Sequence, residues 1–282
     1  MKYIDLHVHS NYSDGTLSPT QIVSLAIEKK LAAFALTDHD TVEGIEEAIS
    51  AAKEATLKGH AITVIPGTEL SASYKGEDIH ILGLGLNHKS PILLKALQEA
   101  KEERDHRNHK MCHNLQEAGI PITVEKMREA CKDAVLTRAH FAKFMVNEGF
   151  ASSIKEAFTK YLDSSSPYYV TREYMTPKQA IELILAANGV PVLAHPLLYK
   201  LGDSELKTLL QELKSYGLKG IEAIYSNNIS NDEAYVKSLA REFDLFITGG
   251  SDYHGSVKPD IDLGTGRGNL KIPESILKKL GL

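Results

Sequence analysis

Histidine and carboxylate side chains recur along this 282-residue chain in a pattern that suits metal binding. In the segment IDLHVHSNYSDG, His7 and His9 share one face of a predicted strand, because strand side chains repeat every two residues. Asp14 follows just after that strand. A lone histidine is usually a solvated or hydrogen-bonded side chain. Several crowded imidazoles and carboxylates instead need a cation or shifted pKa values.

Five further segments place the same residue types on or just after other predicted strands. They are the segments TDHD, GTE, AHP and GGSDYHG, together with His80 in the fourth predicted strand. The sequence therefore predicts one metal site with nine donors, namely His7, His9, Asp14, His39, Glu69, His80, His195, Asp252 and His254.

The donor types restrict both the ion and the reaction. Imidazole and carboxylate without thiolate suit Mn, Fe or Zn, and nine donors suit two or three divalent ions. Three such ions with three carboxylates and a bridging hydroxide would leave about two positive charges, which match a phosphate monoester dianion. We therefore expect phosphoester hydrolysis in which a metal-bridging hydroxide attacks phosphorus in line.

The elements that must position these donors alternate between strand and helix. The predicted strands cover residues 2–9, 32–37, 62–70, 78–86, 191–195, 220–224 and 245–248. The predicted helices between them cover 18–30, 42–58, 176–188, 203–216 and 232–242. This alternation predicts an α/β fold of parallel βα units that close into a barrel, with the strand ends and the donors at one rim. Two strands without a helix between them, in 62–86, predict an irregular barrel.

A helical insert interrupts the alternation. Helical patterns cover residues 92–118, 124–132, 139–148 and 153–161. We expect a barrel formed by residues 1–90 and 177–282, and a small helical substrate-capping domain formed by 91–176.

Composition restricts the partners and the compartment. The net charge of −5 argues against binding long nucleic acid, and no apolar run approaches the ~20 residues of a membrane span. The first residues show no signal-peptide pattern. Cys112 and Cys131 lack the spacing of a disulfide framework, so we expect reduced thiols in a cytoplasmic protein. The oligomeric state stays open.

The motifs DLHVHSNYSDG, TDHD, GTE, AHP and GSDYHG, in this order and with His80, resemble the polymerase and histidinol phosphatase (PHP) family. The resemblance spans nearly the whole chain and implies a distorted seven-stranded TIM-like barrel with a trinuclear metal site. It implies a first ion held by His7, His9, Glu69 and Asp252, a second by Glu69, His80 and His195, and a third by Asp14, His39 and His254. Asp5 would orient a ligand imidazole or form a strand-end hydrogen bond, and Asp38 and Asp40 could act similarly.

The insert holds five of the seven arginines, the residue type best suited to bidentate phosphate binding. With TRAH where relatives often read RPH, it resembles the PHP subgroup that acts on nucleoside 3′,5′-bisphosphates and on the 5′ ends of short oligoribonucleotides. We expect Arg138 to bind phosphate, with His140, Arg104 and Arg107 as further substrate-binding residues; a solvated helix face is the alternative for Arg104 and Arg107.

Other readings stay open. His195 or His254 could transfer a proton to the leaving oxygen. Histidinol-phosphate phosphatase and a non-catalytic, metal-stabilised binding module are alternative functions. His106, His109 and His113 share a helix face but lack a neighbouring general-base Glu, so we expect them to be solvated. Glu222 ends a predicted strand and has no assigned role.

Overall fold

The computed structural model describes residues 2–130, 135–170 and 175–282. The chain forms two compact units, which are treated separately below. The barrel unit comprises Met1–Ala96 and Met175–Leu282, and the helical unit comprises Leu97–Tyr174.

The barrel unit is an α/β fold built on one seven-stranded sheet of described residues, ordered as the strands occur in the chain. The strands are β1 (Ile4–Val8), β2 (Ala33–Leu36), β3 (Thr63–Tyr74), β4 (Glu77–Leu84), β5 (Val190–Leu193), β6 (Gly220–Tyr225) and β7 (Phe246–Gly250). All seven lie where the sequence predicts strands, within a few residues at each end. The expected distorted barrel is confirmed.

The direction of one strand differs from the expectation of parallel units. β4 runs antiparallel to both β3 and β5, whereas the other neighbouring pairs are parallel. The reason is the two-residue turn at Lys75 and Gly76, both with positive φ, which joins β3 directly to β4 and leaves no room for a crossover helix. His80 consequently lies in the middle of β4, opposite Ser71, and not at a carboxyl end.

The barrel closes through the segment that follows β7. The N–H of Asp252 donates to the carbonyl of His7 (2.9 Å), and the N–H of His9 donates to the carbonyl of Tyr253 (3.0 Å). The buried Asp5 carboxylate accepts from the N–H groups of Ser251 (2.8 Å) and Gly264 (2.7 Å). Asp5 thus forms the strand-end hydrogen bonds of the alternative reading, and the expectation that it orients an imidazole is wrong.

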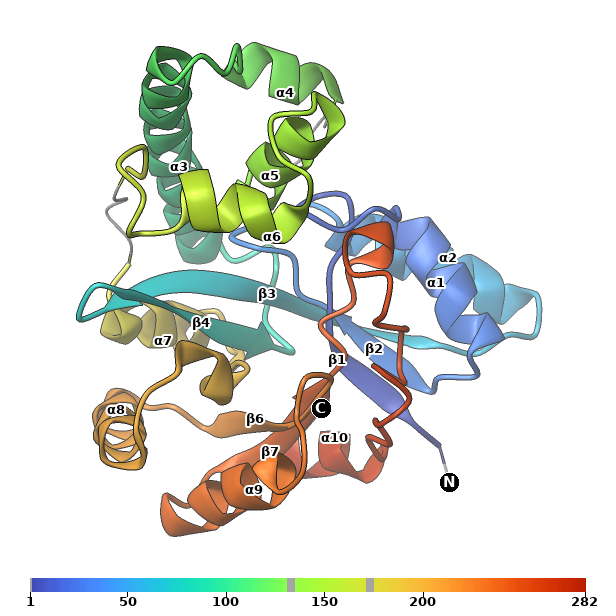
Figure 1. Ribbon diagram of the computed structural model, residues 1–282. Helices are drawn as coiled ribbons and strands as arrows, with labels where there is room; N and C mark the ends of the chain where they lie inside the picture. Colours follow the sequence, from blue (N-terminus) through green and yellow to red (C-terminus); the bar gives the residue numbers. More distant parts are fainter. Residues whose placement is uncertain (1, 131–134, 171–174) are drawn as a thin grey trace. The chain divides into compact units, whose positions relative to one another are not determined.

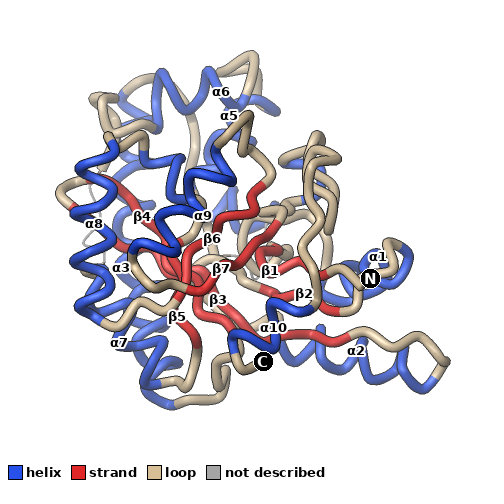
Figure 2. Tube along the Cα trace, turned by 90° about the horizontal axis from the view of Figure 1, so that it is seen from below, coloured by secondary structure: helices blue, strands red, loops and turns tan. Residues whose placement is uncertain are grey.

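Helices surround the strands of the barrel unit. They are α1 (Pro19–Glu28), α2 (Ile45–Leu57), α7 (Pro177–Ala186), α8 (Asp203–Tyr216), α9 (Asp232–Glu242) and α10 (Ser275–Leu280), with short 3-10 turns at Pro196–Tyr199 and Gly255–Val257. Figure 2 shows the strands at the centre of this unit, with α1, α2, α7 and α8 outside them. The sequence reading missed α10, whose six residues are too few for a clear helical period.

The helical unit has its own apolar core. The chain enters it through α3 (Pro91–Glu117) and continues with α4 (Val124–Ala130), α5 (Arg138–Asn147), α6 (Ile154–Ala157) and a π-helical turn (Phe158–Leu162), coloured green to yellow in Figure 1. Met111, Leu115, Phe141, Met145 and Leu162 are fully buried within this core.

Some expectations for this unit fall outside the described residues, namely the end of the predicted helix 124–132, Cys131 and Arg172. Cys112 is a free, buried thiol, and burial raises its pKa to about 12. No helix in the described ranges is long and apolar enough to cross a membrane.

We expect Gly250→Ala to destabilise the barrel unit, because a Cβ at this position would lie 2.2 Å from the Cβ of His7 and 2.7 Å from its backbone nitrogen. Overpacking of this kind costs about 1–3 kcal/mol. Urea unfolding measures the change, and Gly202→Ala is the control, since its nearest neighbour is a flexible Glu205 oxygen at 3.5 Å. Equal stability of the two variants would contradict the close approach of β7 to β1.

Candidate metal centre

Nine predicted donors from both ends of the sequence meet within the barrel unit. His7 lies on β1, Glu69 on β3 and His80 on β4. The others follow strands: His9 and Asp14 follow β1, His39 follows β2, His195 follows β5, and Asp252 and His254 follow β7. His39 and His80 are half-buried and the remaining seven are buried. The barrel thus brings all nine side chains into one cluster.

One oxygen of the buried Glu69 carboxylate faces three imidazoles. Its Oε2 lies 3.3 Å from His7 Nε2, 3.1 Å from His9 Nε2 and 3.1 Å from His39 Nδ1. His39 is positioned by an isolated parallel β-bridge between its backbone and that of Glu69, just beyond the paired part of β2 and β3.

The second oxygen of Glu69 faces two other imidazoles. Its Oε1 lies 2.8 Å from His80 Nδ1 and 3.0 Å from His195 Nε2. The antiparallel direction of β4 places His80, in the middle of that strand, beside the same oxygen as His195, which follows β5. Glu69 therefore lies between two groups of nitrogen donors.

Asp14 and Asp252 complete the cluster and contact His254, His39 and His9. Asp14 Oδ1 lies 3.2 Å from His254 Nε2, and Asp14 Oδ2 lies 3.7 Å from His39 Nε2. Asp252 Oδ1 lies 3.3 Å from His254 Nδ1 and 3.5 Å from His9 Nε2. The rings of His9 and His254 stack with their centroids 4.1 Å apart.

These distances fit donors around common cations. Two atoms bound about 2.1 Å from one tetrahedral ion lie about 3.4 Å apart, and most of the separations above are near this value. In the described residues, three groups of donor atoms lie within 4.8 Å of one another: His9, Asp14, His39 and His254; His7, His9 and Glu69; and His39, Glu69 and His80. Donor chemistry and spacing therefore both suit divalent metal ions.

The electrostatics of the cluster give Glu69 and His39 the protonation states that metal ligands require. Burial raises the pKa of the Glu69 carboxyl, but the imidazoles of His39, His80 and His7 more than offset it, so the pKa lies well below its usual range. Burial lowers the pKa of His39 to about 4, although Glu69 and Asp14 oppose this shift. At neutral pH Glu69 is therefore ionised and His39 is neutral.

Two aspartates beside His39 support the cluster through serines. Asp38 accepts from Ser13 Oγ (2.5 Å) and from the Ser10 N–H (2.7 Å), and Ser13 Oγ also lies 3.4 Å from His9 Nδ1. Asp40 accepts from the N–H (2.9 Å) and hydroxyl (3.0 Å) of Ser71 on β3. These contacts hold the loops that carry His9 and His39.

Two residues beside Asp252 were missed by the sequence reading. Tyr225 Oη (2.8 Å) and Lys258 Nζ (2.6 Å) both donate to Asp252 Oδ2, which leaves Oδ1 facing the imidazoles. The direction of the Tyr225 side chain could not be predicted from strand periodicity, because β6 has a register shift between Glu222 and Ile224 that interrupts the alternation of faces. For Lys258, six residues after Asp252, we find no sequence signal.

The predicted substrate-binding residues belong to the helical unit. Arg104 and Arg107 on α3 are buried, so the alternative of a solvated helix face is wrong for them. Arg138 begins α5 with its guanidinium 5.6 Å from the centre of the Tyr169 ring. His140 accepts the Thr137 N–H at Nδ1 (3.0 Å) within the N-terminal cap of α5. His106, His109 and His113 are exposed, as expected.

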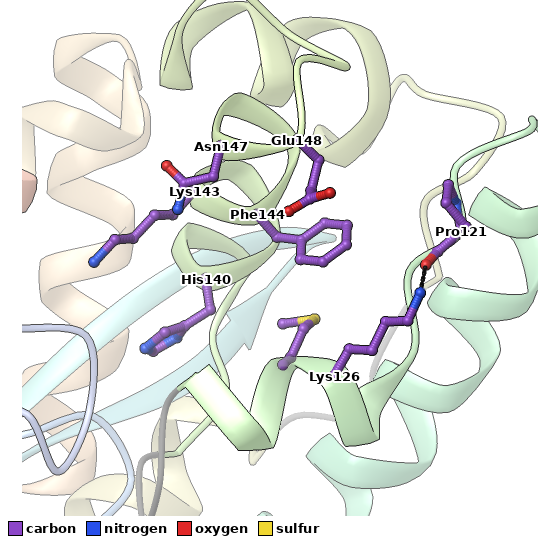
Figure 3. Close-up of a pocket in the computed structure, with 8 residues that line it drawn as sticks. Pro121, Lys126, His140, Lys143, Phe144, Asn147 and Glu148 are labelled. Carbon is purple, nitrogen blue, oxygen red and sulfur yellow. Dashed lines mark hydrogen bonds between the residues drawn. The ribbon is translucent and has the colours of Figure 1, made fainter.

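A cavity of about 380 Å³ lies between α4 and α5 of the helical unit (Figure 3). Met127 and Phe144 supply apolar surface, while Lys126, Lys143 and His140 supply nitrogen atoms. Lys126 Nζ donates to the Pro121 carbonyl (3.0 Å), which fixes one side of the cavity.

Known proteins are similar to this chain over most of its length. A 5′-3′ exoribonuclease of Haemophilus influenzae is 37% identical over 253 residues, which cover 90% of each chain. A 3′,5′-nucleoside bisphosphate phosphatase of Chromobacterium violaceum is 33% identical over 94% of this chain and 91% of the relative.

A solved structure from Chromobacterium violaceum, described as an amidohydrolase with bound sulfate and no metal, superposes with a TM-score of 0.88. It is 31% identical and covers 99% of this chain and 96% of that one. The model of the PHP domain matches residues 5–220, which include seven of the nine donors; Asp252 and His254, which follow β7, lie beyond the match.

 Because this match covers more than half of the chain, and the relatives above exceed 30% identity over nine-tenths of it, the chain belongs to the PHP domain family.

Proposed function

We propose that this protein hydrolyses phosphate monoesters of small nucleotides. The reaction would convert a nucleoside 3′,5′-bisphosphate and water into a nucleoside 5′-monophosphate and phosphate, and the same site would act on the 5′ ends of short oligoribonucleotides. The observation that carries this proposal is the buried cluster around Glu69, where five imidazole nitrogens lie within 3.3 Å of one carboxylate. The names of the two relatives support the choice of substrate.

The alternative functions fit less well. The two relatives described above are named for nucleotide and RNA substrates, so histidinol-phosphate phosphatase is not favoured. A non-catalytic binding module would be expected to have lost donors, whereas all nine are present in this sequence. The protein is a phosphoric ester hydrolase of the PHP family.

We propose two or three divalent ions, Mn, Fe or Zn, with the donors distributed as the family resemblance implies. One ion would be held by His7, His9, Glu69 and Asp252, a second by Glu69, His80 and His195, and a third by Asp14, His39 and His254. When bound, such ions would lower the pKa of a water molecule and withdraw charge from the phosphoryl oxygens.

The remaining roles fall to residues of the chain itself. We propose that residues 91–176 form a substrate-binding insert in which Arg138 and His140 bind phosphate, with Arg104 and Arg107 as further contributors. We also propose that His195 or His254 transfers a proton to the leaving oxygen. His195 Nδ1 is buried without a hydrogen-bond partner among the described residues, whereas both ring nitrogens of His254 face oxygen atoms.

A panel of phosphoesters assayed with Mn²⁺ tests the proposed activity. We expect kcat/KM for adenosine 3′,5′-bisphosphate to exceed that for histidinol phosphate by at least about tenfold, because a pocket built for one substrate loses polar contacts with the other. Release of phosphate and AMP is followed by chromatography. Preference for histidinol phosphate would reverse the assignment, and no turnover of any ester would favour the binding module.

Metal uptake should weaken as the pH falls, because imidazole binds a metal only when it has lost its proton. Burial lowers the pKa of His7, but Glu222, Glu69 and Asp252 raise it well above its usual range, so a bound ion must displace this proton. We expect the Mn²⁺ content after equilibrium dialysis to fall between about pH 8 and about pH 5. A constant content over this range would contradict the histidine-rich ligand set.

Arg138→Ala should raise KM for a nucleoside 3′,5′-bisphosphate by about 10–100-fold and lower kcat much less, because a charge-assisted contact to the non-reacting phosphate is lost. The effect should shrink for a nucleoside 3′-monophosphate, which lacks that phosphate. Arg128→Ala is the matched control, since this arginine of the same unit pairs with Asp105 (2.5 Å). Unchanged kinetics for Arg138→Ala would remove this residue from the site.

A further inference from the structure

Glu222 on β6 is a fully buried carboxylate whose two oxygens contact two different donors of the cluster. Its Oε1 lies 3.0 Å from His7 Nδ1. Its Oε2 accepts the backbone N–H of His195 at 2.8 Å. Both oxygens of Glu222 therefore contact residues of the cluster. Glu222 itself belongs to none of the three donor groups found among the described residues.

The first contact determines which nitrogen of His7 faces the other donors. A carboxylate oxygen accepts hydrogen bonds, so the contact with Glu222 places the ring proton on His7 Nδ1. When the ring holds a single proton, Nε2 carries the lone pair, and this atom lies 3.3 Å from Glu69 Oε2 and 3.7 Å from Asp252 Oδ1. A neutral imidazole can bind a metal only through its unprotonated nitrogen.

The second contact holds a strained backbone. His195 has φ of 27° and ψ of 57°, a left-handed conformation that is uncommon for a residue other than glycine. It joins the end of β5 to the 3-10 turn Pro196–Tyr199, and its N–H is anchored by Glu222. This anchor directs the ring so that Nε2 lies 3.0 Å from Glu69 Oε1.

We propose that Glu222 is a positioning residue of the metal centre, which selects the Nδ1–H tautomer of His7 and fixes the backbone that carries His195. One side chain thereby orients His7 on β1 and His195 after β5, which face different oxygens of Glu69. This inference rests on the proposed function. It assigns Glu222 no contact with the substrate or with the reacting atoms.

Glu222→Gln tests the tautomer with almost no change of volume. The amide oxygen can still accept the His195 N–H, but the amide NH₂ then faces His7 Nδ1 and moves the ring proton to Nε2. Loss of such a supporting contact typically weakens metal binding about 10–100-fold. We expect this loss for Mn²⁺ in equilibrium dialysis, together with thermal unfolding of the metal-free variant close to that of the wild type.

The tautomer itself is read from long-range ¹⁵N–¹H NMR spectra of the metal-free full chain, recorded at a pH above the raised pKa of His7, where the ring holds a single proton. The His7 signals are assigned through His7→Gln. We expect the proton on Nδ1 in the wild type and on Nε2 in Glu222→Gln. Asp5→Asn is the matched control, because Asp5 is equally buried but accepts backbone N–H groups, and this variant should keep the wild-type tautomer of His7.

A single ring proton on Nε2 of His7 in the wild type at this pH would overturn the inference, and so would a Glu222→Gln protein with unchanged tautomer and unchanged affinity for Mn²⁺. Because the wild-type spectrum needs neither a variant nor an ion, the inference can be rejected even if Glu222→Gln does not fold. A wild-type protein that takes up no divalent ion would instead refute the proposed function, while the spectrum would still decide the tautomer.

Discussion

The interaction on which the barrel unit depends is the contact of one buried carboxylate with five imidazoles. Glu69 is 1% exposed, and both of its oxygens are surrounded by ring nitrogens from four separate segments. A buried charge without compensation would cost several kcal/mol, so these segments must arrive together. The strands achieve this because each one delivers its donor on the strand or within a few residues of its end.

The donors are held by a second set of buried groups that contact mostly backbone. Asp5 anchors the N–H of Ser251, Asp40 anchors Ser71 and Glu222 anchors His195. Each carboxylate lies on or just after a strand and reaches a segment that is distant in sequence. Donors supported in this way keep their positions before a ligand arrives, which lowers the cost of binding.

The sequence was sufficient to locate all seven strands and to select nine side chains that the barrel unit brings together, because strand alternation and residue type are local properties. The direction of β4 was not predicted, since it depends on a two-residue turn at Lys75 and Gly76 within an otherwise continuous apolar pattern. The contact of Tyr225 with Asp252 also escaped, because the register shift in β6 breaks the alternation of faces along this strand.

The most direct measurement of the central claim is anomalous diffraction from a crystal equilibrated with Mn²⁺ and recorded on both sides of the manganese absorption edge. The account predicts two or three anomalous peaks within bonding distance of the nine donor side chains, with one peak beside each oxygen of Glu69. Saturated crystals that show no peak inside this cluster, or peaks only at surface carboxylates, would contradict it.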